Sequence, residues 1–277
     1  MFCYTFPFPS TDEYKTKKLV LRKVEKGDYW IGGPEGSSTI MGRGANSYHK
    51  VIVDKNFYFG VFMVTRDQYQ RVMEGSAAGA NTLFKTGVSW NTLRASSGSA
   101  AKVLAGTTFI GILNQKISPD DDPQTGFDLP TESMWEIAAR AGNTHKLPSG
   151  DVCAASEINA YAWSKENSGG TVPKVGTKPP NAWGIYDYIG GVWDITRDTA
   201  NSLDLATLQP NALVPIASAG GSQSAASFTM RGSSYDHYFG DFVGADYSWF
   251  RYSTRWMDTK SGTWADIGFR LTFIPEK

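Results

Sequence analysis

Cysteine is almost absent from this chain of 277 residues, since only Cys3 and Cys153 occur. Two cysteines so far apart make neither the dense disulfide framework of small secreted domains nor the paired spacing of a zinc site. Histidine is also scarce, and His49, His145 and His237 form no HxxxH pair of metal ligands. The sequence therefore predicts no bound metal.

Common catalytic signatures are missing as well. The chain contains no GxSxG elbow, no Walker loop and no dinucleotide-binding glycine fingerprint. These absences argue against the corresponding hydrolases, phosphate-binding NTPases and nicotinamide-dependent enzymes. We expect no bound cofactor.

The chain also lacks an excess of either charge. Lys plus Arg and Asp plus Glu each number 27, so the formal net charge is zero. A nucleic-acid-binding domain normally carries a basic excess, and a membrane span needs a long apolar run that this chain lacks. We expect no nucleic-acid partner, no transmembrane segment and a monomeric protein.

Glycine and aromatic residues are plentiful, with 29 Gly, 9 Trp, 13 Tyr and 15 Phe, whereas charged residues make up only 19%. This composition is typical of a loop-rich domain whose loops are pinned by rings, although a large aromatic core explains it equally well. The length suits one elaborated domain. No repeat or linker divides the chain, so we predict a single domain over residues 1–277.

Periodicity predicts a few short elements. Residues 19–31 alternate as a strand, a turn at Gly27-Asp28 and a second strand, and residues 50–63 continue this character. Helices are expected after the N-cap residues Thr65 and Thr131 and around residues 109–116. Further short strands are expected at 191–196, 229–233 and 268–273. Residues 76–107, rich in Ala, Ser, Gly and Thr, are expected to form a surface insertion.

Six segments, in this order, resemble the formylglycine-generating-enzyme (sulfatase-modifying factor) family: VEKGDYWIGGPEG, FYFGVFMVTRDQYQRVM, LPTESMWEIAARAG, YAWSKENSGGTVPKVGTKPPNAWGIYDYIGGVWDITRD, MRGSSY and IGFRLTF. The resemblance runs from Val24 to Phe273 and is interrupted by the insertion. It implies an α+β domain with the C-type lectin-like fold of that family, with short twisted antiparallel strands, a few helices and much irregular structure.

Four large residues within these segments are expected to support the scaffold. Trp183 and Trp193 are expected to pack beneath glycine-rich turns, because glycine lets backbone approach a ring closely. Arg231 and Arg270 are expected to be buried and to donate to loop carbonyls.

The resemblance does not extend to the family's chemistry. Oxidases of the family hold copper through a cysteine pair near the C-terminal end, where soft thiolates suit Cu(I). The corresponding region, Arg231 to Phe269, contains no cysteine. A calcium-binding Asn of the family's GNVW motif is replaced by Gly191, and only Asn159, Asn167 and Asp187 remain as candidates for another calcium site. We predict that the chain is not an enzyme.

The region without cysteines is instead rich in aromatic residues and aspartates. Rings interleaved with polar residues without a regular period are typical of recognition surfaces. We predict a ligand-binding segment near residues 235–266, formed by Asp236, His237, Tyr238, Phe239, Asp241, Phe242, Asp246, Tyr247, Tyr252, Trp256, Asp258, Trp264 and Asp266. Some rings, Tyr235 and Trp249 among them, are expected to pin the loop from inside.

This segment resembles the variable region of proteins diversified by retroelements, such as the Treponema variable proteins. In such systems adenines of a template are randomised, typically in AAY codons. Every residue from Gly232 to Ser248 is accessible from such codons, whereas Trp249, Trp256, Met257, Lys260 and Trp264 are not and would be fixed positions.

We therefore expect a non-catalytic binding protein with a diversified C-terminal surface that recognises a protein, peptide or glycan. Two alternatives stay open: a non-variable family member with a fixed protein or glycan partner, and a metal-dependent oxidase with rearranged ligands. The first residues, MFCYTFPFPS, lack the pattern of a signal peptide. A bacterial cell-surface location with the export signal absent from this chain is expected, and a cytoplasmic one stays open.

Overall fold

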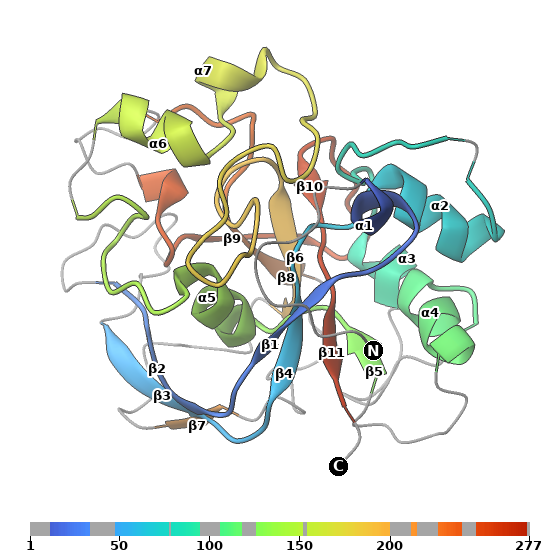
Figure 1. Ribbon diagram of the computed structural model, residues 1–277, viewed down its shortest axis with the longest axis horizontal. Coiled ribbons are helices and arrows are strands. Elements are labelled where there is room, and N and C mark those ends of the chain that lie inside the picture. Colours follow the sequence, from blue (N-terminus) through green and yellow to red (C-terminus); the bar gives the residue numbers. More distant parts are fainter. Residues whose placement is uncertain are drawn as a thin grey trace.

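The computed structural model describes residues 12–33, 48–77, 79–94, 106–117, 126–151, 154–199, 212–214, 227–239 and 248–275. In this part of the chain, short strands and helices alternate with long irregular segments (Figure 1). None of the helices described there is long and apolar enough to cross a bilayer. The expected α+β character is confirmed.

A four-stranded antiparallel sheet brings the two ends of the chain together. Its strands, in spatial order, are β1 (Leu21–Val24), β4 (Phe57–Gly60), β11 (Thr272–Ile274) and β5 (Gly126–Asp128). Phe57 and Phe59 alternate along β4 and are both buried in the core. Burial of these rings fixes which face of β4 points inward.

A second sheet contains β2 (Gly27–Ile31), β3 (His49–Val53) and β7 (Ala212–Val214). Gly27 and Asp28 lie inside β2, so the turn predicted at these residues is wrong. The chain turns two residues earlier because β1 and β2 belong to different sheets, one pairing with β4 and the other with β3.

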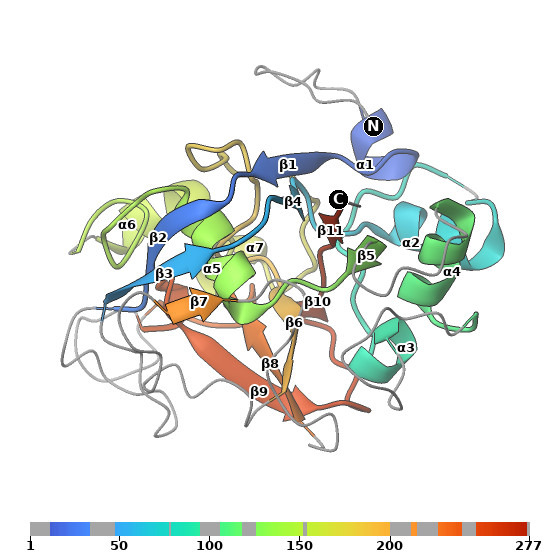
Figure 2. The same cartoon turned by 90° about the horizontal axis from the view of Figure 1, so that it is seen from below.

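The third sheet carries the C-terminal segment. Its order is β10 (Ile267–Gly268), β6 (Trp193–Thr199), β8 (Ser227–Arg231) and β9 (Arg255–Thr259). Figure 2 shows β8 and β9 on the side of the molecule away from β1. The strands expected near 191–196 and 229–233 are confirmed with shifted ends. The strand expected near 268–273 is instead two short strands, β10 and β11, which belong to different sheets.

The two helices with strong N-cap signals form as expected. Thr65 caps α2 (Arg66–Glu74) in a reciprocal capping box with Gln68, and Gly75 ends it at φ 80°. Thr131 caps α5 (Glu132–Arg140) by accepting a hydrogen bond from Met134 N at 3.1 Å. The other helices are α1 (Glu13–Thr16), α3 (Trp90–Arg94), α4 (Phe109–Ile117), α6 (Ala155–Tyr161), α7 (Lys165–Ser168) and the 3-10 turn η3 (Ser248–Phe250).

The expectation of a surface insertion over residues 76–107 is wrong for residues 84–94, whereas residues 79–81, 106 and 107 are exposed as expected. Phe84, Trp90 and Leu93 are all fully buried, and Trp90 Nε1 donates to the carbonyl of Thr196 at 3.2 Å. Composition suggested a polar loop, but these few large apolar residues tie residues 84–94 into the core. Residues 95–105 of the predicted insertion lie outside the described chain.

Buried charges connect α5 to β8. Glu132, Glu136 and Arg140 recur every fourth residue, so they share one face of α5. Arg231, the last residue of β8, pairs with Glu132 Oε2 at 3.1 Å and with Glu136. Glu136 in turn accepts from Arg140 Nε at 2.8 Å. All four side chains are almost completely buried.

Arg270 organises a second buried polar cluster. Its Nε donates to Asp194 Oδ2 at 2.8 Å, and its Nη2 donates to the carbonyl of Asp187 at 2.7 Å. Further donation reaches the carbonyls of Gly60 and Tyr186. The expectation that Arg231 and Arg270 are buried and bond loop carbonyls is confirmed, since Arg231 also donates to the carbonyl of Tyr252.

The two scaffold tryptophans behave differently. Trp193 is buried as expected. Trp183 is half-buried and packs edge-on against Tyr29, with ring centroids 6.0 Å apart.

Replacing Arg231 by methionine tests the buried network. R231M should destabilise the fold by about 3–5 kcal/mol, because it takes away one of the cations that balance the buried carboxylates of Glu132 and Glu136. The matched control is R66M on the exposed start of α2, which should change stability by about 0.5 kcal/mol or less. Urea unfolding measures both, and equal effects of the two variants would contradict the assignment.

Asp198 gives the fold a defined pH dependence. Burial, followed by the neighbouring Glu132 carboxylate, raises the pKa of Asp198 to about 7. In the unfolded chain this carboxyl ionises near pH 4. Between these values the folded state holds a proton that the unfolded state has lost, so this group's contribution to stability falls as pH rises from about 4 to about 7.

D198N should remove that pH dependence, because asparagine stays neutral and its Oδ1 still accepts from Glu132 N. The melting temperature of D198N minus that of the wild type should rise between pH 5 and pH 8. We expect a rise of about 3 °C or more, corresponding to about 1 kcal/mol for a chain of this size. A difference that stays constant over this range would show that Asp198 is ionised throughout.

Candidate functional site

The C-terminal segment begins in a tight turn directly after β8. Gly232 and Ser233 have φ values of 96° and 68°, and a Cβ at Gly232 would lie 3.0 Å from the ring of Trp135. The turn pairs with the glycine loop before β6, since Gly190 N donates to the Gly232 carbonyl and Tyr235 N donates to the Gly191 carbonyl, each at 2.7 Å. The start of the segment is thus held by backbone.

A hydrogen-bonded chain of three side chains joins the two ends of the segment. Ser234 Oγ donates to Asp266 Oδ2 at 2.8 Å and lies 2.8 Å from His237 Nδ1. Because the single hydroxyl proton goes to Asp266, the serine oxygen accepts from Nδ1–H of His237. Ser234 and Asp266 therefore fix the orientation and tautomer of the His237 ring.

His237 also belongs to a cluster of rings. It lies 4.3 Å from Trp249 and 5.5 Å from Trp193, measured between ring centroids. Trp249 packs edge-on against both Trp193 and Trp256. Trp193 and Trp249 are buried, whereas His237 and Trp256 are half-exposed, so the cluster reaches from the core to the surface.

The short helix α7 supports the other side of residues 236–239. Lys165 Nζ contacts Asp236 Oδ1 at 2.9 Å and lies 5.2 Å from the ring centroid of Tyr238. Glu166 Oε1 accepts a hydrogen bond from Phe239 N at 2.9 Å. Sequence reasoning missed Lys165 and Glu166, because no pattern in the sequence links α7 to a segment about seventy residues away in the chain.

The predicted site residues divide into four groups. The exposed ones are Asp236, Tyr238 and Trp264. The half-buried ones are His237, Trp256, Asp258 and Asp266. Asp241, Phe242, Asp246 and Tyr247 lie outside the described residues. The buried ones are Phe239 and Tyr252.

The prediction that Phe239 and Tyr252 face a ligand is wrong, because both rings belong to the core. Phe239 is 4% exposed and packs edge-on against Phe250. Tyr252 is 1% exposed and stacks on Tyr188. The guanidinium of Arg140 lies over the Tyr252 ring, 5.0 Å from the ring centroid. Burial raises the pKa of the Tyr252 phenol, so it stays neutral.

Tyr235 and Trp249, expected to pin the loop from inside, are 7% and 6% exposed, so that expectation is confirmed. Of the three residues considered for calcium, Asn159 and Asn167 hydrogen-bond to each other through their side chains at 2.7 Å. Asp187 instead accepts from Gly176 N at 2.7 Å. Within the described chain, no group of three or more His, Cys, Asp or Glu side chains is arranged to hold a metal ion.

Comparison with known proteins agrees with this fold. The model of the sulfatase-modifying factor enzyme 1-like domain matches residues 8–273. Treponema denticola variable protein 1 has a similar structure, with a TM-score of 0.66, 22% identity, and coverage of 93% of this chain and 95% of that one. PvdO from Pseudomonas aeruginosa matches with a TM-score of 0.68 and 18% identity over 97% of this chain and 99% of its own.

Curated relatives match this chain over only part of their own length. Serine/threonine-protein kinase pkn1 of Chlamydia pneumoniae is 26% identical over 185 residues, which are 63% of this chain and 27% of that protein. Formylglycine-generating enzyme of Mycobacterium tuberculosis is 35% identical over 80 residues, 26% of this chain and 27% of the enzyme. The chain thus spans about a quarter of the length of these curated relatives.

The family match covers nearly the whole chain, and the structural matches share its C-type lectin-like architecture. The glycine-rich turns, the buried arginines and all the strands described above, except for Ile274 at the end of β11, lie within the matched residues. This chain belongs to the sulfatase-modifying factor enzyme 1-like family.

Proposed function

We propose that this protein binds a ligand without transforming it, and that residues 235–266 form its recognition surface. The observation that carries the proposal is that the segment is fixed at both ends while some of its side chains are exposed. A hydrogen bond from Ser234 to Asp266 joins its two ends. The side chains of Asp236, Tyr238 and Trp264 are exposed to solvent.

The exposed residues have the chemistry of a recognition surface. Tyr238 and Trp264 are 45% and 54% exposed, and large rings offer contact area at low entropic cost. Asp236 adds a carboxylate, held in place by Lys165. Such a surface suits a protein, peptide or glycan ligand, because rings and carboxylates serve all three.

The second part of the proposal is that this surface is diversified by a retroelement at the bacterial cell surface. Its support is the run from Gly232 to Ser248, all of whose residues are accessible from randomised AAY codons. The similarity of fold to Treponema denticola variable protein 1 is consistent with this proposal.

The absence of catalysis is proposed from the sequence. Thiolates are the ligands that a Cu(I) oxidase needs, and residues 231–269 contain no cysteine. The residues that the structure gathers here, Ser234, His237 and Asp266, are arranged with the serine between the other two. In a nucleophilic triad the histidine stands between the serine and the acid, so this arrangement serves positioning.

Alanine substitution separates the surface from its support. D236A, Y238A and W264A should each change the free energy of unfolding by about 0.5 kcal/mol or less, since exposed side chains contribute little. F239A and Y252A should each cost about 3–5 kcal/mol, because truncating a buried ring leaves a cavity. Thermal and urea unfolding of the five variants measure the difference. Large losses from the first three variants would show that the proposed surface is structural.

Copper binding tests the proposed lack of oxidase chemistry. The purified protein should not retain Cu(I) against a chelator, and it should not convert the thiol of a cysteine-containing peptide to an aldehyde. Metal analysis and mass spectrometry of the peptide measure the two properties. Stoichiometric copper together with aldehyde formation would favour an oxidase with rearranged ligands.

A further inference from the structure

The charges of residues 235–266 are sorted between the surface and the interior. The sequence of this segment contains five aspartates and three cations, which are Arg251, Arg255 and Lys260. Two of the cations are buried, and the third, Arg255, pairs with the buried Glu132 at 2.5 Å. Asp236 is exposed, and Asp258 and Asp266 are half-buried. In its described part, the segment thus leaves carboxylates accessible while its own cations face the interior.

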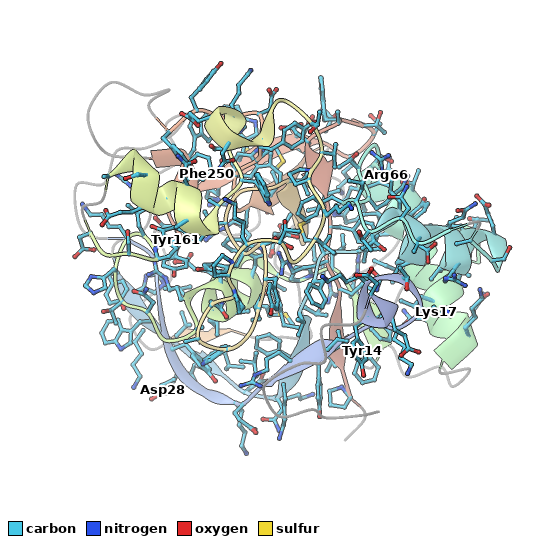
Figure 3. All side chains as sticks on the ribbon, turned by 45° about the horizontal axis from the view of Figure 1, so that its top comes forward. Tyr14, Lys17, Asp28, Arg66, Tyr161 and Phe250 are labelled. Carbon is cyan, nitrogen blue, oxygen red and sulfur yellow. The ribbon has the colours of Figure 1, made fainter. Side chains whose placement is uncertain are left out.

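Tyr238 and Asp236 form a ring–carboxylate pair that already holds a cation. Lys165 Nζ of α7 lies 2.9 Å from Asp236 Oδ1 and 5.2 Å from the centroid of the Tyr238 ring. In Figure 3, Phe250 of the segment lies on the side of the view that carries α6 and α7, away from Lys17. An ammonium group in such a place gains both an ion pair and a cation–π contact. The protein's own lysine therefore shows which kind of group this arrangement accepts.

Trp264 and Asp258 form a second ring–carboxylate pair, in the turn after β9. Gly262 N donates to the Thr259 carbonyl at 2.9 Å, which closes the turn. A Cβ on Gly262 would lie 3.1 Å from each of Asp258 Oδ1, Thr259 Oγ1 and Trp264 Nε1. The three side chains therefore converge on one small space, which stays open because glycine has no Cβ.

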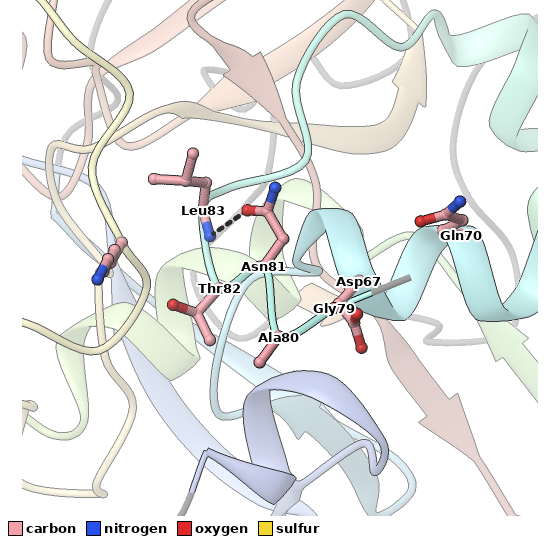
Figure 4. A pocket seen from close by; sticks show the side chains of 8 residues that line it. Asp67, Gln70, Gly79, Ala80, Asn81, Thr82 and Leu83 are labelled. Atoms are coloured by element: carbon pink, nitrogen blue, oxygen red, sulfur yellow. Dashed lines mark hydrogen bonds between the residues drawn. The ribbon is translucent and has the colours of Figure 1, made fainter. Parts of the chain in front are cut away.

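Asp258 has no cation partner among the residues that the structure describes. Its Oδ1 accepts from Thr259 N at 2.5 Å, and no described Lys, Arg or His forms an ion pair with it. Trp264 is 54% exposed, and its ring contacts no other ring or cation of the described chain. Asp67, drawn in Figure 4, is the opposite case, because it is 1% exposed and pairs with Arg71 at 2.8 Å. The pair in the turn after β9 is thus available to a ligand.

We infer that Asp258 and Trp264 bind a Lys or Arg side chain of a peptide or protein ligand. The inference rests on the proposed function and names the class of ligand that the surface recognises. An acidic ligand would be repelled by the accessible carboxylates, and a neutral glycan would leave Asp258 unpaired. An ammonium or guanidinium group pairs with Asp258 and lies beside the indole of Trp264, as Lys165 does at Asp236 and Tyr238.

Titration of the full chain with short peptides tests the inference. The probes are acetylated and amidated pentapeptides Gly-Gly-X-Gly-Gly, in which X is arginine, lysine, citrulline or glutamate, and the methyl glycoside of N-acetylglucosamine. Citrulline is the matched control, because it has the shape of arginine without its charge. The readouts are the NMR signals of the Trp264 indole N–H and of the Tyr238 backbone amide.

The arginine and lysine peptides should shift the Trp264 signal along a saturable curve at low ionic strength. The citrulline peptide should bind about threefold to tenfold more weakly, which is the size expected of one exposed ion pair with a cation–π contact. High salt should weaken the binding of the charged peptides, because it screens exposed charges.

The other outcomes separate this inference from the proposed function. Equal binding of the arginine and citrulline peptides, or tighter binding of the glutamate peptide or the sugar, would overturn the inference and leave a recognition surface in place. Saturable shifts of the Tyr238 amide alone would do the same. If no probe shifts either signal, the inference fails, and the result counts against a recognition surface as well.

Two variants locate the binding of the arginine peptide. D258N keeps an acceptor for Thr259 N but removes the charge, so it should weaken this binding about threefold to tenfold. The control D54N makes the same chemical change at an exposed carboxylate between β3 and β4 and should leave binding unchanged. Undiminished binding by D258N would overturn the inference. Because arginine and citrulline are compared on the wild-type chain, that comparison answers the question even if D258N misfolds.

Discussion

The rest of the structure depends on the buried ion pairs that the Arg231 guanidinium makes. It is 1% exposed, and it pairs with Glu132 and Glu136 of α5 at the end of β8. Its Nη2 also donates to the carbonyl of Tyr252 at 2.9 Å, on the far side of the C-terminal segment. One side chain thus joins α5, the third sheet and the middle of the C-terminal segment.

The electrostatics of this arrangement explain why the charges come as a set. Burial alone would raise the pKa of Glu136, but the neighbouring Arg140 and Arg231 outweigh it and hold that pKa below its ordinary value. The carboxylate therefore stays ionised and keeps both arginines paired. Removing one member would leave the remaining buried charges unbalanced, which is far more costly than losing a surface ion pair.

In the C-terminal segment, the residues that hold the backbone in place are different from the residues that are exposed for recognition. The segment is held by backbone hydrogen bonds at Gly190, Gly191 and Gly232. The buried ring of Trp249 and the hydrogen bond between Ser234 and Asp266 also hold it. The exposed side chains of Asp236 and Tyr238 take no part in the core. Under the proposed function, residues at such positions change without cost to the fold, because the segment is held by parts that do not change.

Local sequence signals predicted the parts of the fold that local physics determines. The caps at Thr65 and Thr131 fixed the starts of α2 and α5, since an N-cap side chain acts within three residues. The burial of Arg231 and Arg270 followed from their place in the family resemblance. The ion pairs that these arginines make could not be predicted, because their partners are separated by as many as 99 residues in the chain.

The candidate site was predictable in position but not in detail. Composition located an aromatic segment, yet it could not distinguish Phe239, which is buried, from Tyr238, which is exposed. Neighbouring residues of an irregular segment have no period from which to read an inward face. The support from Lys165 and Glu166 depends on tertiary contact alone, and only the structure reveals it.

The most direct test of the central claim is the sequencing of many sibling copies of this gene. A diversified recognition surface predicts that substitutions concentrate between Asp236 and Asp266, at adenine-derived codons. Arg231, Glu132, Glu136 and Trp249 should stay constant, because they hold the segment in place. Substitutions spread evenly along the chain, or a segment 236–266 identical in every copy, would contradict the account.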